Sequence, residues 1–170
     1  MSNRNTLEAE DVVRTHAQKT HLQEPEKTVL HILRDRLLSM RMLYIGVGGG
    51  RTTLHFTSLI REYVGTDYSD NMIKACTRRF SPLPENVTFQ VCDARAMDIF
   101  NDNSFDFVLF SYNGLDYISH QDRLQALREI KRICAKGGCF CFSTHNLQSL
   151  SELPEFRKHR SNINQSTART

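Results

Sequence analysis

The sequence has no apolar run long enough to form a membrane-spanning helix. Such a helix needs ~18 or more consecutive apolar residues, and no stretch of the 170 residues approaches that length. Residues 1–10 are polar and lack the apolar core of a secretion signal. We therefore expect a cytoplasmic protein that has no membrane partner.

The chain also has little excess of charge of either sign. Charged residues make up 24% of the sequence, and the formal net charge at pH 7 is +3. Proteins that bind nucleic acids usually carry a basic surface interleaved with aromatic residues, and no such stretch precedes the C-terminal tail. The composition therefore predicts a protein without a nucleic-acid partner.

Patterns typical of metal sites and disulfide frameworks are missing as well. The five cysteines are odd in number and include no CxxC pair, so they suggest neither a disulfide framework nor a zinc site. Cys139 and Cys141 alternate with Phe140 and Phe142, as expected for a strand whose two faces pack differently. We expect no metal ion in this protein.

Glycine is scarce, and half of it lies in one place. Four of the 8 glycines fall within residues 46–50, directly after the apolar run at residues 43–45. Glycines between a strand and a helix let a ligand approach the backbone closely. The pattern predicts a helix over residues 52–60, whose first N–H groups would favour the anionic part of a ligand.

A second strand that ends in an acidic residue follows the glycines. Residues 62–67 have the pattern of a short strand that ends in Asp67, about twenty residues after Gly46, where ribose-binding acids lie in dinucleotide-type folds. A glycine turn alone is weak evidence, because loops collect glycines for other reasons. Strand, glycines, helix, strand and acid in this order indicate a site for a nucleotide-like cofactor.

Helical and strand patterns alternate through the rest of the chain. Further helices are predicted at residues 24–37, 69–80 and 119–134, the last ended by the turn at residues 136–138, and further strands at residues 87–92, 105–111 and 139–144. The aromatic run of the fourth strand is typical of a central strand buried on both faces. Five strands separated by helices predict an α/β, Rossmann-like, doubly wound and mostly parallel sheet with a ligand crevice at the carboxyl ends of the strands.

Four motifs in order make the chain resemble the class I S-adenosylmethionine-dependent methyltransferases. They are the loop at residues 45–51, with Gly46, Gly48 and Gly50 on the positions of the family's GxGxG loop, and residues 65–69, 92–94 and 110–113. The resemblance runs over residues 24–146. It implies that S-adenosyl-L-methionine is the cofactor and S-adenosyl-L-homocysteine its product.

The resemblance also implies a role for each motif. The loop would cradle the methionine moiety, Asp67 would accept hydrogen bonds from the ribose hydroxyls, and Asp93 would accept one from the adenine amine. The residues implied to contact the cofactor are Tyr44, Gly46, Gly48, Gly50, Arg51, Asp67, Tyr68, Met72, Asp93, Ala94 and Ser111. Tyr44 stands where the family usually has an acid, and its hydroxyl can accept one hydrogen bond in place of a carboxylate.

The chemistry that such a site performs needs few catalytic groups. Methyl transfer from a sulfonium depends mainly on holding the acceptor in line, because the leaving group is already activated by its charge. A base is needed where the acceptor carries a proton of high pKa. The candidates for these roles are Tyr112, Asn113, His120 and His145. His145 follows the fifth strand at the ligand end of the sheet, which suits a base, although most surface-loop histidines have no catalytic role. The acceptor is expected to be a small molecule.

Two other functions fit parts of the sequence. A nicotinamide-dependent dehydrogenase shares the strand, the glycines and the acid, but its GxGxxG spacing needs a glycine where Arg51 stands. A non-catalytic cofactor-binding or partner module would keep the fold without turnover. A turnover assay with a broad panel of acceptors separates this module from an enzyme.

The domain organisation expected is a helical or frayed segment at residues 1–23, a methyltransferase domain at 24–146 and a polar, basic tail at 147–170. The family has further C-terminal strands, and the tail lacks the alternating apolar pattern that would form them. The fifth strand would then be an exposed edge, which favours self-association. Cofactor binding is expected to be more robust than turnover.

Overall fold

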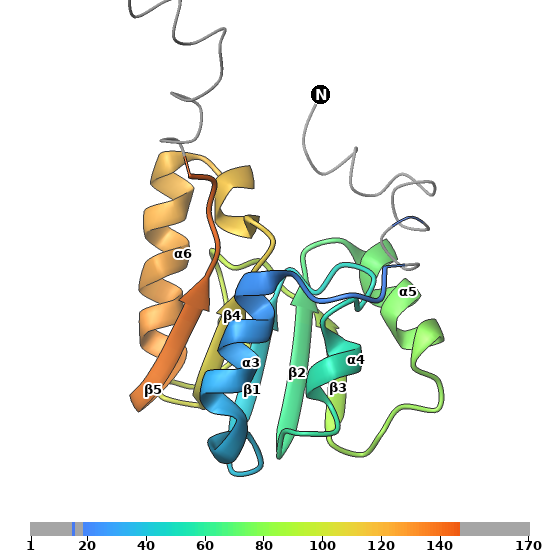
Figure 1. Ribbon diagram of the computed structural model, residues 1–170. Coiled ribbons are helices and arrows are strands. Elements are labelled where there is room, and N and C mark those ends of the chain that lie inside the picture. The colour runs from blue at the N-terminus through green and yellow to red at the C-terminus, as the bar shows by residue number, and fades with distance from the viewer. Residues whose placement is uncertain (1–14, 16–18, 147–170) are drawn as a thin grey trace, which may run out of the picture.

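A computed structural model describes residue 15 and residues 19–146 of the chain. Five strands form one sheet in the order β3-β2-β1-β4-β5, and each pair of neighbours is parallel (Figure 1). The strands are β1 (Arg41–Ile45), β2 (Glu62–Asp67), β3 (Val87–Val91), β4 (Phe105–Phe110) and β5 (Cys134–Phe142). The predicted α/β class and parallel sheet are confirmed.

The helices begin at residues suited to capping them. They are α3 (Glu24–Leu37), α4 (Thr53–Phe56), α5 (Asp70–Arg79), α6 (His120–Ile133) and the 3-10 helix η1 (Gly114–Tyr117). The side chain of Ser69 accepts the N–H of Met72 at the start of α5, and the side chain of Ser119 accepts the N–H of Asp122 at the start of α6. Both starts were predicted from the sequence and are confirmed.

Each face of the sheet has its own hydrophobic core. On one face, Leu37, Phe56 and Cys76 bring α3, α4 and α5 against the strands, and Figure 1 shows α3 and α4 in front of the sheet. On the other face, Ile130 and Ile133 bring α6 against the sheet. Helices therefore cover both faces, and the doubly wound arrangement is confirmed.

The helix after the glycines is shorter than predicted. The sequence pattern predicts a helix over residues 52–60, whereas α4 has only 4 residues. The hydroxyl of Thr52 donates to the Tyr44 hydroxyl at 3.0 Å, and the hydroxyls of Thr53 and Tyr63 lie 2.8 Å apart. These β-branched residues favour helix weakly, and their side chains are fixed by partners on the sheet. The predicted length of this helix is therefore wrong.

The fifth strand starts earlier than predicted and is irregular. It follows α6 directly at Cys134, and the predicted turn at residues 136–138 lies inside it. Phe105 pairs with Cys134, but Phe107 pairs with Cys139, so the strand carries extra residues between these two pairs. Gly137 absorbs the irregularity with a φ of 80°. The middle strand of the sheet is β1. The buried strand β4 lies between β1 and β5.

The sheet order sets where a ligand would lie. From β1 the chain moves to β2 and β3 on one side and later to β4 and β5 on the other, so the order reverses between β1 and β4. Ligand crevices of open α/β sheets lie at this reversal, outside the carboxyl ends of the strands. Within the described part of the chain, no helix has the length and apolar character to span a membrane.

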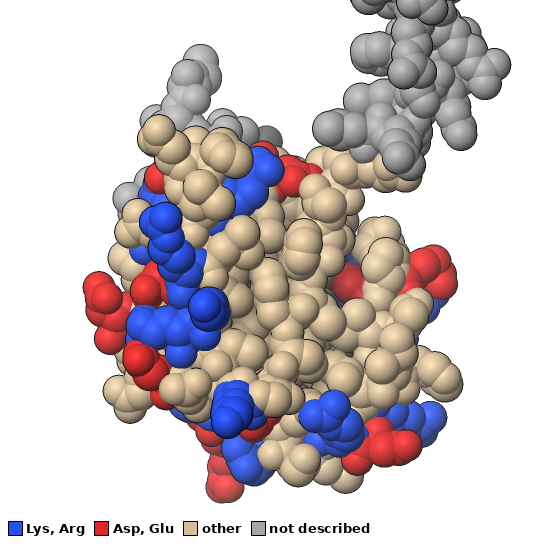
Figure 2. Space-filling view, turned by 90° about the vertical axis from the view of Figure 1, so that its left-hand side faces the viewer, with Lys and Arg blue, Asp and Glu red and all other residues tan. Residues whose placement is uncertain are grey.

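The side of the molecule formed by α6 and β5 has a largely uncharged central surface. Figure 2 shows this surface bordered by acidic and basic side chains. On β5, the residue Phe142 is 53% exposed, and its ring stacks on that of Phe140 with ring centres 5.2 Å apart. The tail predicted at residues 147–170 and most of the segment predicted at residues 1–23 lie outside the described residues.

Candidate functional site

The glycine turn after β1 has the geometry that its sequence predicts. Gly46, Gly48 and Gly50 have φ values of 71°, 54° and 79°, a region that side chains rarely allow. A Cβ atom on Gly50 would lie 2.5 Å from the ring of Phe80, and one on Gly46 would lie 3.3 Å from the ring of Phe110. A side chain would be strained by the backbone conformation at all three positions, and at Gly50 it would also clash with Phe80.

Asp67 at the end of β2 is joined to this turn. Its Oδ2 accepts the N–H of Gly48 at 3.0 Å, and its Oδ1 accepts the N–H of Ser69 at 3.0 Å. Burial raises the pKa of this carboxyl, and the N–H groups of Ser69, Gly48 and Tyr68 partly oppose the rise. Three donors do not fill the roughly four acceptor positions of a carboxylate. Asp67 thus keeps acceptor capacity toward a ligand such as a ribose.

The residues predicted to surround the adenine lie beyond Asp67. Met72 is buried, and Tyr68 and Ala94 are half-buried. Asp93 is engaged by a neighbour, because Arg95 donates from Nε to Oδ1 at 2.9 Å and from a terminal nitrogen to Oδ2 at 2.6 Å. A ligand amine that reaches Asp93 would have to share this carboxylate with Arg95.

Three of the residues predicted to contact the cofactor, Tyr44, Arg51 and Ser111, meet in a buried polar network. The hydroxyl oxygens of Tyr44 and Ser111 lie 2.8 Å apart and link β1 to the end of β4, where the sheet order reverses. The hydroxyl of Ser111 in turn donates to Oε1 of Glu26 at 2.5 Å. Burial raises the pKa of the Tyr44 phenol, so this hydroxyl remains protonated.

Glu26 of α3 is the centre of this network. Arg51 donates to its Oε2 at 2.5 Å and to its Oε1 at 2.6 Å, and the N–H of Gln23 donates to Oε2 at 2.8 Å. The side chains of Glu26 and Arg51 are only 3% and 8% exposed. Burial acts to raise the pKa of Glu26, but the bonds from Arg51, Ser111 and Gln23 outweigh it and lower the pKa. This ion pair fastens α3 to the glycine turn.

Sequence reasoning missed the role of Glu26. The spacing from Gln23 to Glu26 carries a capping-box signal, which indicates a helix start but not a partner. Arg51 is 25 residues away in sequence and Ser111 is 85 residues away. No local pattern connects these three residues.

Residues 19–23 lie over the glycine turn rather than forming a helix (Figure 1). The carbonyls of Lys19 and His21 accept hydrogen bonds from Arg79 at 2.9 Å and from Arg51 at 3.0 Å. The carbonyl of Thr20 lies 2.7 Å from Nε2 of His55. This short segment forms one wall over the turn.

The predicted acceptor-side residues Tyr112 and Asn113 follow β4 in an uncommon conformation. Their φ values are 57° and 58°, which for two consecutive non-glycine residues marks a sharply turned chain. Tyr112 is exposed, and its hydroxyl accepts a hydrogen bond from Lys19 at 3.2 Å. The guanidinium of Arg51 also lies over its ring, 5.1 Å from the centre. Tyr112 therefore stands between the glycine turn and the acceptor side.

The structure brings His145 and Asn113 together and adds Asp116, which sequence reasoning missed. Nδ1 of His145 lies 2.7 Å from Oδ2 of Asp116, and Nε2 lies 3.1 Å from Nδ2 of Asn113. Burial acts to raise the pKa of Asp116, but bonds from His145 and Thr144 outweigh it and lower the pKa. The ionised Asp116 thus fixes the Nδ1 proton and leaves Nε2 as a proton acceptor. His120, the remaining candidate, is exposed at the start of α6.

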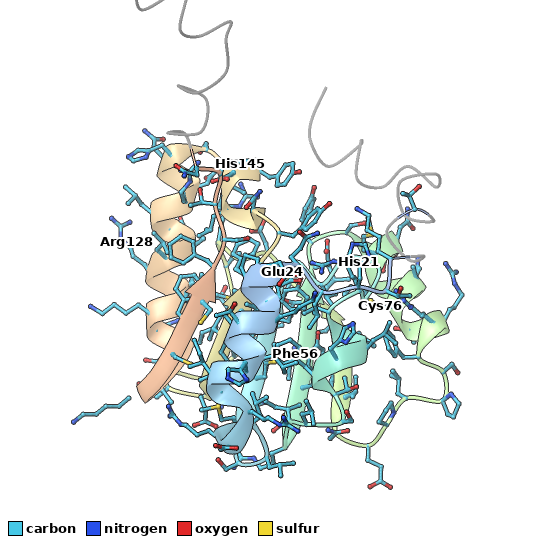
Figure 3. The ribbon with its side chains drawn as sticks, in the orientation of Figure 1. His21, Glu24, Phe56, Cys76, Arg128 and His145 are labelled. Atoms are coloured by element: carbon cyan, nitrogen blue, oxygen red, sulfur yellow. The ribbon has the colours of Figure 1, made fainter. Side chains whose placement is uncertain are left out.

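A cavity of about 220 Å³ lies beside this pair, between the start of α3 and the ends of β4 and β5. Its lining comes from Gln23, Pro25, Glu26 and Val29 of α3 and its cap, Leu109, Ser111, Tyr112 and Asn113 around the end of β4, and Cys141, Phe142, Ser143 and Thr144 around the end of β5. Figure 3 shows His145 above the end of β5 and His21 on the side of the glycine turn. The ligand end of the sheet therefore has two neighbouring parts: the first is the glycine turn with Asp67, and the second is this cavity, whose lining includes Glu26 and Ser111.

The residues of the first part fit S-adenosylmethionine. The turn has three glycines with positive φ, so it can present backbone without side chains to a ligand. Asp67 is a buried hydrogen-bond acceptor beside that turn. A backbone cradle next to a carboxylate suits a nucleoside with a charged amino-acid end.

Comparison with known proteins gives the same picture. Residues 42–138 match the family model described as "Methyltransferase domain". An uncharacterized methyltransferase of Bacillus subtilis, YcgJ, is 31% identical over 120 residues, which are 70% of this chain and 46% of YcgJ. A demethylmenaquinone methyltransferase of Lysinibacillus sphaericus is 33% identical over 99 residues, which are 57% of this chain and 38% of the relative. The chain thus spans less than half the length of these curated relatives.

Solved structures show the same fold. The crystal structure of YcgJ superposes with a TM-score of 0.64 at 26% identity, over 76% of this chain and 56% of YcgJ. The PH0226 protein of Pyrococcus horikoshii superposes with a TM-score of 0.65 at 22% identity, over 86% of this chain and 71% of that protein.

Proposed function

The chain belongs to the methyltransferase-domain family, and we propose that it binds S-adenosylmethionine and transfers the methyl group to a small-molecule acceptor. The observation that carries this proposal is the direct link between the glycine turn and Asp67, through the 3.0 Å bond from the N–H of Gly48. The turn would hold the methionine end, and Asp67 would accept hydrogen bonds from the ribose. When bound, the cofactor supplies an activated methyl group on a sulfonium.

Residues of this chain would do the rest of the chemistry on the acceptor side. Asn113 would help to position the acceptor, and Tyr112 would border it. Nε2 of His145 would take a proton from the acceptor, because Asp116 holds the other ring nitrogen in its protonated form. The Asp116–His145 pair therefore suits an acceptor whose nucleophilic atom carries a proton.

A small acceptor is preferred to a nucleic acid on two grounds. The cavity beside His145 has a volume of about 220 Å³, which suits part or all of a small molecule. One relative is named for a quinone acceptor, demethylmenaquinone. Strong, salt-sensitive binding of RNA or DNA to this protein would contradict the proposal.

A calorimetric titration with S-adenosylhomocysteine tests the cofactor part. We expect binding by the wild-type protein and a loss on the order of 2 kcal/mol, near thirtyfold in affinity, for Asp67→Ala. Asp70→Ala is the matched control, since Asp70 lies three residues further on, is exposed, and pairs with Lys74 on the surface of α5. Equal affinities of wild type and Asp67→Ala would show that Asp67 does not hold the ribose.

Self-association through β5 is a further part of the proposal. Phe142 is exposed on this strand, and an exposed apolar strand at the side of a sheet favours pairing with another chain. We expect size-exclusion chromatography to show a dimer that Phe142→Lys shifts toward the monomer. A monomer at all concentrations of the wild-type chain would exclude this contact.

A further inference from the structure

We propose that Cys139 and Cys141 of β5 form an oxidation site, at which a hydroperoxide oxidises Cys141 and Cys139 then closes a reversible disulfide with it. The pair lies on a different strand from the glycine turn and Asp67, so the proposal does not depend on methyl transfer. It rests on the common strand face of the two thiols, on their direct contact and on the access to Cys141.

The two thiols lie on the same face of one strand. Their register partners on β4 are Phe107 and Leu109. Both cysteines pack against the core on the α3 side, whereas Phe140 between them packs against the opposite core. The thiol of Cys139 donates a hydrogen bond to the sulfur of Cys141. The two sulfur atoms are therefore in contact before any oxidation.

Cys141 is the thiol that a small reagent can reach in its ionised form. It is half-buried and lines the cavity of about 220 Å³ between α3 and the ends of β4 and β5. The hydrogen bond from Cys139 lowers the pKa of the Cys141 thiol to about 7, although burial opposes this change. A substantial fraction of Cys141 is then thiolate at neutral pH, which is the form that attacks peroxides.

Cys139 is suited to the second step. The hydrogen bond to Cys141 and burial both raise the pKa of the Cys139 thiol, so this thiol keeps its proton. Two charged groups nearby have weaker, opposite effects: Arg36 of α3 acts to lower this pKa, and Asp106 at the start of β4 acts to raise it. One thiol of the pair is thus the nucleophile, and the other is the proton-bearing partner beside it.

The other three thiols lack this combination. Cys76 is buried, its Sγ donates to a carbonyl of the glycine turn at 3.1 Å, and burial raises its pKa to about 12. Cys92 is also buried, and burial raises its pKa to about 11. Cys134 packs against the core on the α6 side, and burial raises its pKa as well. A peroxide should therefore select the pair on β5.

The oxidation takes two steps. The Cys141 thiolate attacks the O–H oxygen of the hydroperoxide, so an S–O bond forms, the O–O bond breaks, and the released alkoxide or hydroxide takes a proton from water. Cys139 then attacks the sulfur of the Cys141 sulfenic acid, and its thiol proton leaves with the hydroxyl group as water. Both sulfur atoms are oxidised, and the peroxide is reduced.

The strand geometry makes this disulfide easy to reduce. A strand rises about 3.2–3.4 Å per residue, so Cα atoms two residues apart are about 6.4–6.8 Å apart, at the upper end of the span of a disulfide. A bridge between them is strained, and strained disulfides are the labile ones. Since β5 ends the sheet order, one of its edges has no neighbouring strand in the described part of the chain and can bend.

The experiment treats the full chain at pH 7 with hydrogen peroxide in slight excess, blocks the remaining thiols with iodoacetamide in denaturant, and maps the peptides by mass spectrometry. Trypsin places Cys139 and Cys141 on one peptide, residues 137–157, and Cys134 on another, residues 133–136. We expect the first peptide to lose two hydrogen atoms and to escape alkylation, and dithiothreitol to reverse both changes. The other three cysteines should stay fully alkylated.

Three serine variants assign the roles of the thiols. Cys139→Ser keeps a hydroxyl donor beside Cys141 but cannot form the bridge, so oxidation should stop at a sulfenic acid that dimedone traps. Cys141→Ser should slow oxidation of the peptide by roughly tenfold or more, because the remaining thiol keeps its proton. Cys134→Ser is the matched control on the same strand and should behave as wild type. Circular dichroism checks that all three variants are folded.

Several outcomes would overturn the proposal. A wild-type peptide 137–157 that keeps both thiols, or that gains a sulfinic acid without a disulfide, would show that the pair does not close. A bridge that joins this peptide to residues 133–136 would assign the partner role to Cys134. Equal oxidation rates of wild type and Cys141→Ser would show that Cys141 is not the attacking thiol, and equal oxidation of Cys76 or Cys92 would show that the site has no selectivity.

Discussion

Two buried carboxylates at the ligand end of the sheet, Glu26 and Asp67, have opposite surroundings. Glu26 receives four hydrogen bonds, two of them from the buried cation Arg51, and its pKa is lowered. Asp67 receives backbone N–H groups only, no cation contacts it among the described interactions, and its pKa is raised by burial. Both side chains are less than a tenth exposed.

The difference suggests two roles: Glu26 is a structural carboxylate, and Asp67 is the one proposed to bind a ligand. A carboxylate whose acceptor positions are filled has nothing left to offer, so Glu26 stabilises the contact between α3 and the glycine turn. A buried carboxylate with remaining acceptor capacity and a perturbed pKa is typical of a binding site. The proposed cofactor site therefore depends on Asp67, whereas Glu26 holds α3 beside the glycine turn.

The two carboxylates also respond oppositely to pH. Because the folded-state pKa of Glu26 is depressed, its stabilising effect is present above the unfolded value near 4.5 and is lost as the pH falls through the lower folded value. Asp67 has a raised folded-state pKa, so its contribution to stability decreases as the pH rises from 3.8 toward that raised value.

The largest expected effect is that of removing Glu26. Glu26→Ala leaves the guanidinium of Arg51 buried without a counter-charge, so we expect the free energy of unfolding to fall by about 3–5 kcal/mol. Urea denaturation followed by circular dichroism measures it. Glu24→Ala is the control on the same helix turn, because Glu24 is 84% exposed and pairs with Lys27 at the surface. Similar losses for the two variants would show that the buried pair is not what holds α3.

Two glycines, Gly50 of the glycine turn and Gly137 of β5, allow the cost of a strained backbone to be compared with and without a side-chain clash. Gly50 and Gly137 have nearly equal φ values, 79° and 80°. A Cβ on Gly50 would lie 2.5 Å from Phe80, whereas one on Gly137 would meet no atom within 4 Å. We expect Gly137→Ala to cost about 1–2 kcal/mol from conformation alone, and Gly50→Ala about 1–3 kcal/mol more from the clash. Equal melting temperatures would mean that the turn adjusts around the added methyl group.

The smallest expected effect concerns Asp93, which resembles neither buried carboxylate because it is half-exposed and paired with Arg95. Arg95→Ala removes a competitor for the carboxylate that is predicted to accept the adenine amine. We expect S-adenosylhomocysteine to bind about threefold more tightly, the range of an exposed ion pair. Weaker binding to Arg95→Ala would indicate that the guanidinium itself contacts the ligand.

Local patterns predicted most of the fold. The apolar runs of β1, β2 and β4 and the serine caps of α5 and α6 depend on neighbours in sequence, and all of them are confirmed. The four-residue α4 was not predicted, because its threonine hydroxyls bind tyrosines of the sheet. The early start of β5 was missed because a register shift opposite β4 leaves no periodic signal.

The residues of the candidate site also fall into those that local patterns predicted and those that they missed. Gly46, Gly48, Gly50 and Asp67 are separated by short, regular intervals, and the sequence predicted their placement. Glu26 and Asp116 were missed because their partners lie far along the chain, Ser111 at 85 residues and His145 at 29 residues. Such pairs depend on how α3 and η1 pack, which no local spacing encodes.

The most direct test is the pH dependence of S-adenosylhomocysteine affinity for wild type and Asp67→Asn. If Asp67 is the ligand's acceptor, wild-type affinity falls as the pH is lowered from neutrality through the raised pKa of this carboxyl, because protonation removes its charge and weakens it as an acceptor. Asp67→Asn then binds roughly thirtyfold more weakly at neutral pH and lacks that dependence. An Asp67→Asn protein with wild-type affinity and an unchanged pH profile would contradict the assignment of this buried carboxylate to the cofactor.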